Sequence, residues 1–143
     1  MGNFAVHIAV GAVAAAATGG VMFGLREHLP AVEPVVKTIP TVCGAMVFGS
    51  IYPDTDIKSK SSYICNFILI AVCAVSFYFF KQYYISGLAA GMVIVALFTP
   101  HRGPCHRLWF NLLVAVLIGV LFNPYPAIGY FIGVMAHLVS DGR

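Results

Sequence analysis

Residues 4–24 read FAVHIAVGAVAAAATGGVMFG, a stretch with one histidine and no charged side chain. A helix of about 20 apolar residues spans a bilayer core of about 30 Å. The rest of the chain has the same character, because 60% of its 143 residues are apolar and 9% are charged. Soluble domains carry about 25% charged residues. The composition therefore excludes a water-soluble globule and indicates a chain embedded in lipid.

Five further apolar stretches follow, at about residues 38–52, 63–80, 83–99, 108–122 and 127–140. Only Lys81 and Gln82 separate the third stretch from the fourth, which predicts a tight hairpin, and the prolines within 123–126 predict a turn. Residues 38–52 are short for a span, so this segment either crosses with little tilt or is re-entrant. The predicted fold is all-α: one membrane-embedded domain over residues 1–143, a compact polytopic bundle of about six transmembrane helices.

The basic residues indicate the orientation of this bundle. They are scattered singly and the formal net charge is only +3, which argues against a nucleic-acid surface. On the side of both termini, counting across the predicted spans finds Lys58, Lys60, Arg102, Arg107 and Arg143, whereas the other side has Arg26, Lys37 and Lys81. Because Lys and Arg are in excess on the cytoplasmic side of membrane proteins, we expect both termini in the cytoplasm.

The same count places most ionisable residues at the cytoplasmic membrane face. They are His7, Asp54, Asp56, His101, His106, His137 and Asp141. His137 and Asp141 are four residues apart on the last segment, so they share a helix face and can reach one centre. Ionisable residues at membrane depth are costly and usually mark a paired or functional site.

These residue types point to metal chemistry. Imidazole and carboxylate groups together suit zinc, manganese, iron or nickel. Seven potential ligands exceed what one tetrahedral zinc needs, so we expect one or two divalent ions, with zinc as the first candidate. In such centres the ion activates water and polarises a phosphoryl or carbonyl oxygen, and a carboxylate such as Asp54 or Asp56 serves as general base. Arg102 can pair with an anionic substrate group through its planar guanidinium.

Simpler interpretations exist for the same residues taken one at a time. A histidine near a helix end is commonly a hydrogen-bonded interfacial residue, and Pro53–Asp56 alone is an ordinary acidic turn or helix cap. Glycine pairs at a spacing of four let helix backbones approach closely, either within the chain or in a homo-oligomer. The pairs are Gly20/Gly24, Gly87/Gly91 and Gly129/Gly133.

Four stretches resemble the YdjM family, described as inner-membrane metal-dependent hydrolases under SOS-type repressor control. The family pattern is a His in the first helix, a Pro-Asp-x-Asp-His turn, a His-Arg-Gly-x-Thr-His-Ser loop, and a late helix with Gly and then Ser-His-x-x-x-Asp. The matching residues are His7, Pro53–Asp56, His101–Gly103 with His106, and Gly133 with His137 and Asp141. The resemblance implies a metal-dependent hydrolase of the bacterial inner membrane. A centre at headgroup level favours a phosphoester or phospholipid-like substrate.

Three positions depart from the family pattern. Ile57 stands where the pattern has His, and Cys105 and Arg107 stand where it has Thr and Ser. The departures leave a second interpretation open, a non-catalytic membrane binding or regulatory protein in which the cluster holds a structural ion or a polar network. A third interpretation, an ion or proton pathway, requires polar residues through the depth of the bundle, whereas most here lie at one end.

Overall fold

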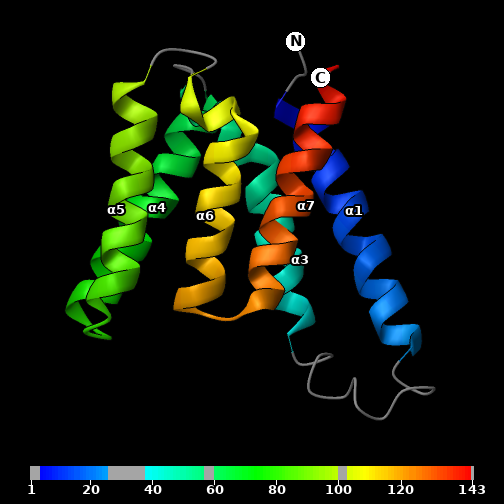
Figure 1. Ribbon diagram of the computed structural model, residues 1–143, viewed down its shortest axis with the longest axis horizontal. Helices are drawn as coiled ribbons and strands as arrows, with labels where there is room; N and C mark the ends of the chain where they lie inside the picture. The colour runs from blue at the N-terminus through cyan, green and yellow to red at the C-terminus, as the bar shows by residue number, and fades with distance from the viewer. Residues whose placement is uncertain (1–3, 26–37, 57–59, 100–102, 143) are drawn as a thin grey trace. The chain divides into compact units, whose positions relative to one another are not determined.

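The computed structural model describes residues 4–25, 38–56, 60–99 and 103–142 (Figure 1). This part of the chain is almost entirely helical and contains no strand. In chain order the elements are α1 (Phe4–Leu25), α3 (Ile39–Ile51), η2 (Tyr52–Asp56), α4 (Lys60–Tyr78), α5 (Tyr83–Phe98), η3 (Pro104–His106), α6 (Leu108–Leu121) and α7 (Pro124–Ser140). The all-α prediction is confirmed, and every predicted apolar stretch is a helix whose ends differ by a few residues.

The two connections that the sequence predicted behave differently. Lys81 turns the chain between α4 and α5 with a positive φ of 56°, as expected for a tight hairpin. The prolines at 124 and 126 do not form a separate turn, because α7 already begins at Pro124. Asn123 caps this helix, since its side chain accepts a hydrogen bond from the Tyr125 backbone N–H at 3.0 Å. Proline is favoured at the first helical position because its missing N–H has no partner there in any case.

One helix of the described residues has the length and composition of a bilayer span, Ala5–Leu25 with 21 residues. The apolar helices Ser62–Tyr78, Tyr83–Phe98 and Leu108–Leu121 are shorter. A perpendicular span takes about 20 residues, with a lower limit of about 17. The polytopic arrangement of about six spans therefore stays a prediction.

The chain forms two compact units, of which the first takes its described residues from 1–51 and 112–143. In this unit α3 packs against both α7 and α1, and α1 also contacts α7. Ala15 of α1 and Val42 and Met46 of α3 form its buried core cluster. α3 is thus the central element that aligns the first helix of the chain with the last.

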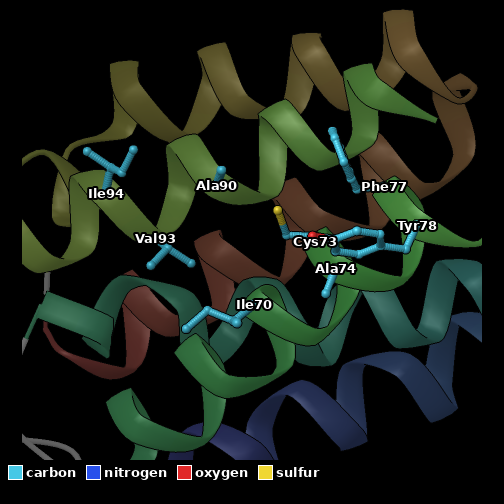
Figure 2. Close-up of a pocket in the computed structure, with 8 residues that line it drawn as sticks. All are labelled: Ile70, Cys73, Ala74, Phe77, Tyr78, Ala90, Val93 and Ile94. Atoms are coloured by element: carbon cyan, nitrogen blue, oxygen red, sulfur yellow. The ribbon is translucent and has the colours of Figure 1, made fainter. Parts of the chain in front are cut away.

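The second unit takes its described residues from 52–111 and contains η2, α4, α5 and η3. α4 pairs with α5, and η2 contacts both of these helices as well as η3. An open groove of about 360 Å³ lies along α4 and α5 (Figure 2). It is lined by Ile70, Cys73, Ala74, Phe77, Tyr78, Ala90, Val93 and Ile94. None of these side chains is charged, so the groove is mainly apolar.

Candidate metal centre

The polar cluster of the first unit combines the start of α1 with the end of α7. His7 is the fourth residue of α1, His137 lies in the last turn of α7, and Asp141 is the C-cap of α7. Both histidines are buried, with 1% and 0% of their surface exposed, whereas the Asp141 side chain is 19% exposed. The cluster therefore has two enclosed imidazole rings and a carboxylate that reaches towards the exterior.

Both imidazole rings turn the same nitrogen to this carboxylate. His7 Nε2 lies 3.5 Å from Asp141 Oδ1, and His137 Nε2 lies 3.7 Å from Asp141 Oδ2. The two rings stack with centroids 4.1 Å apart and planes tilted by 32°. Each of the three residues offers a ligand atom within 4.8 Å of the others. One small volume is therefore surrounded by two nitrogens and a carboxylate.

The other ring nitrogen of each histidine is engaged by a protein oxygen. His137 Nδ1 lies 2.8 Å from the Ser50 carbonyl oxygen, which can only accept, so we assign the proton to Nδ1. The Ser140 hydroxyl donates to the His137 carbonyl at 2.8 Å and lies 3.0 Å from His7 Nδ1. Its single proton is thereby used, so it accepts from a protonated His7 Nδ1. In the neutral rings both Nε2 atoms then carry a lone pair.

Two nitrogen lone pairs that face a carboxylate repel it unless a cation lies among them. A proton on one ring satisfies only part of the cluster, and two protonated rings 4.1 Å apart repel each other. Ligands at about 2.0–2.2 Å from a tetrahedral zinc are about 3.3–3.6 Å apart. The nitrogen–oxygen distances of 3.5 and 3.7 Å are close to this value. The donors of the first unit therefore fit a divalent ion.

Metal-binding histidines in general show this arrangement, because the second ring N–H is donated to an oxygen that fixes the tautomer and the ring. The Ser50 carbonyl and the Ser140 hydroxyl have that position here. Neither Ser50 nor Ser140 is among the residues predicted from the sequence. A serine three residues from a predicted ligand was a usable signal for Ser140, whereas no sequence pattern indicates the role of the Ser50 carbonyl.

Glycines bring α3 close enough to α7 for the Ser50 contact. A Cβ on Gly133 would lie against the Met46 carbonyl and 3.0 Å from the Ser50 nitrogen, and one on Gly129 would press on the Val42 carbonyl. These distances are shorter than a side chain tolerates. The Gly129/Gly133 pair thus packs within the chain. By contrast, Cβ atoms at the pairs Gly20/Gly24 and Gly87/Gly91 would meet no described atom within 4 Å.

A second polar pair belongs to the second unit. His106 Nε2 of η3 lies 3.5 Å from Asp54 Oδ1 of η2, and both residues are buried. The loop that carries His106 is held by Asn111, whose amide donates to the Cys105 carbonyl at 2.7 Å. The loop that carries Asp54 is held by Ser62, whose hydroxyl donates to the Thr55 carbonyl at 2.7 Å.

Five of the seven predicted metal ligands have described side chains, and each unit is considered by itself. His7, His137 and Asp141 meet in the first unit, and Asp54 and His106 meet in the second. His101, Arg102 and the side chain of Asp56 lie outside the described residues. The expectation that these seven residues hold one or two divalent ions stays a prediction.

Comparison with known proteins identifies the family of this chain. A family model described as "YdjM inner membrane protein" matches residues 1–142. Neither the curated proteins nor the solved structures contain a match. The family match covers nearly the whole chain, including both polar clusters. The chain therefore belongs to the YdjM family of inner-membrane proteins.

Proposed function

We propose that this chain is a metal-dependent hydrolase of the inner membrane and that His7, His137 and Asp141 hold a divalent ion. One observation carries the proposal: two buried histidines each engage an oxygen through Nδ1 and present Nε2 to the same carboxylate. A cluster that served only as an ion pair would not need both Nε2 atoms to face one carboxylate.

Zinc is the first candidate for this ion, followed by manganese, iron and nickel, because imidazole nitrogen and carboxylate oxygen suit these metals. Catalytic zinc sites have three protein ligands and keep the fourth position for water or substrate. The two histidines and one carboxylate here supply that number of ligands. When bound, such an ion supplies Lewis acidity that activates water and polarises a phosphoryl or carbonyl oxygen. A requirement for calcium or magnesium would not fit two nitrogen donors.

We further propose that Asp54 and His106 bind a second ion, together with Asp56 and His101. The 3.5 Å separation of the described pair supports this part of the proposal. A carboxylate of this set, Asp54 or Asp56, would accept a proton from water. Arg102 would pair with an anionic group of the substrate through its guanidinium.

The position of the first cluster supports a substrate at the membrane surface. His7 is only three residues from the start of α1, an apolar helix of span length. Three residues correspond to about 4.5 Å along the helix axis. His137 and Asp141 are likewise at the end of α7. Headgroups lie at this depth, so a phosphoester or phospholipid-like substrate fits better than a soluble metabolite.

The finer membrane arrangement belongs to the same proposal. We propose a single multi-pass domain with both termini in the cytoplasm and with open glycine pairs, Gly20/Gly24 and Gly87/Gly91, available to a second copy. The open space beside these glycines supports the last point. Cysteine accessibility at positions 58 and 82, measured in a background without the natural cysteines, tests whether residues 38–52 cross the membrane.

The experiment that tests the metal centre is elemental analysis of detergent-purified protein, prepared without chelators or a histidine tag. Wild type is compared with His137→Gln and Asp141→Asn, and His28→Gln serves as the matched control because it removes a histidine outside the proposed ligand set. We expect two ions of zinc, manganese, iron or nickel per chain in wild type and control, and one ion fewer in both site variants. Absence of metal from the wild type, even after reloading, would overturn the proposal.

A second candidate function is a non-catalytic protein with a structural ion. The near-complete burial of both imidazole rings favours it, as do the departures at Ile57, Cys105 and Arg107. The two functions differ in turnover. The loaded wild type should hydrolyse at least one member of a phospholipid and phosphodiester panel, and Asp141→Asn should not. Bound metal that does not exchange, with no hydrolysis, would support the structural function instead.

A further inference from the structure

We infer that Ser140 is a positioning residue that holds His7 in the Nδ1–H tautomer and thereby directs its Nε2 lone pair at Asp141. The inference rests on the proposed function, because the directed lone pair is what a metal ion would use. It goes beyond that function by assigning a role to a side chain outside the proposed ligand set.

The assignment follows from the number of protons in the network. Ser140 Oγ is 2.8 Å from the His137 carbonyl oxygen, which has no proton to give. The hydroxyl must donate there, and its oxygen is left to accept from His7 Nδ1 at 3.0 Å. The tautomer of a neutral histidine is set by the hydrogen bond of its other nitrogen. Ser140 therefore sets the tautomer of His7.

The two histidines differ in how this control is built. His137 is oriented by the backbone carbonyl of Ser50, which remains present whatever side chain stands at position 50. His7 is oriented by a side chain, and that side chain belongs to α7 rather than to its own helix α1. Position 140 is thus the place where a substitution can release one ring and leave the other as it is.

A purely structural role for Ser140 makes a different prediction. The bond from its hydroxyl to the His137 carbonyl lies three residues back on the same helix and is a common helix-end contact. If Ser140 served only to make that hydrogen bond, Ser140→Ala would destabilise the end of α7 and leave the His7 tautomer unchanged. The tautomer is therefore the measurement that separates the two roles.

Nuclear magnetic resonance of protein labelled with ¹⁵N-histidine tests the inference without metal. Long-range ¹H–¹⁵N correlations at alkaline pH distinguish Nδ1–H from Nε2–H, and His7→Gln assigns the His7 signals. We expect Nδ1–H for His7 and His137 in the wild type. In Ser140→Ala, His7 should change to Nε2–H, donating to Asp141, while His137 should stay Nδ1–H. Ser140→Thr keeps the hydroxyl and should retain the wild-type pattern.

Metal affinity provides the second measurement, by competition with a chromophoric chelator. Loss of an outer partner of a ligating histidine usually weakens metal binding by about 10- to 100-fold. We expect a loss of this size in Ser140→Ala and a value near that of the wild type in Ser140→Thr. The metal-free forms of both variants should melt close to the wild type, which excludes unfolding as the cause.

The outcomes separate this inference from the proposed function. A wild type that binds no metal would refute the proposed metal centre, and the tautomer measurement would still test Ser140. A wild type that binds metal, beside a Ser140→Ala variant with unchanged affinity and an unchanged His7 tautomer, would overturn the inference alone.

Discussion

Replacement of Gly133 by alanine tests whether close helix packing positions the metal centre. The new Cβ would lie against the Met46 carbonyl oxygen, 2.9 Å from the Met46 carbonyl carbon and 3.0 Å from the Ser50 nitrogen. All three atoms belong to the backbone of α3, so no side-chain rotation relieves the contact. Ordinary contact begins near 3.4 Å, and α3 would have to retreat by more than about 0.5 Å to restore it, because the carbonyl oxygen lies nearer than the other two atoms.

This retreat has two energetic consequences. Overpacking of a tight interface costs about 1–3 kcal/mol. The Ser50 carbonyl would also move from 2.8 Å towards about 3.3 Å from His137 Nδ1, beyond ordinary hydrogen-bond length, at a cost of about 0.5–1.5 kcal/mol. Alanine regains about 1 kcal/mol of helix propensity. We therefore expect Gly133→Ala to lower the free energy of unfolding by about 0.5–3.5 kcal/mol.

The assay is denaturant unfolding in one detergent, followed by circular dichroism, with metal content measured on the same preparation. Gly44→Ala is the matched control, because a Cβ there meets no described atom within 4 Å and Gly44 belongs to none of the glycine pairs. The control should be as stable as wild type or more so, and should keep its metal, whereas Gly133→Ala should lose part of both. Equal stability and metal content in the two variants would refute the argument that backbone contact between α3 and α7 positions His137.

Three further predictions concern separate parts of the chain. Asp54→Asn should lower the metal content from two ions to one per chain in elemental analysis, because a neutral amide is a poor metal ligand; unchanged content would contradict the second site. Asn111→Ala should lower the free energy of unfolding by about 1–3 kcal/mol, since it leaves the Cys105 carbonyl without the donor at 2.7 Å; denaturant titration would show the loss, and wild-type stability would count against this role. Lys81→Gly should stabilise the protein by up to about 1 kcal/mol and so raise its melting temperature, because a positive φ of 56° strains the backbone of a residue that has a side chain. A lower melting temperature would contradict this prediction.

The helices of this protein could be predicted from the sequence because their signals are local. Long apolar stretches bounded by Pro, Gly, Asn or charged residues predicted the six α-helices of the described residues, and the start of α7 was the main error. Prolines can follow the end of one helix or stand in the first turn of the next, so Pro124 and Pro126 do not fix the boundary. The Asn123 cap shows that they belong to the first turn of α7. Counting residues across the predicted spans also placed His7, His137 and Asp141 in one set of candidate ligands, and these three side chains lie together in the first unit.

The sequence by itself thus determined the helices, the apolar character of their surfaces and the chemical types of the candidate ligands, since each depends on residue identity and spacing along the chain. The tertiary structure decided which ligands meet and which imidazole nitrogen faces Asp141. It also decided that the Ser50 carbonyl and Ser140 hold the two rings. These features depend on the rotation of α7 about its own axis and on its distance from α3, which the contacts at Gly129 and Gly133 set. No spacing within a single helix encodes such a rotation, because it arises only when two helix surfaces pack against each other.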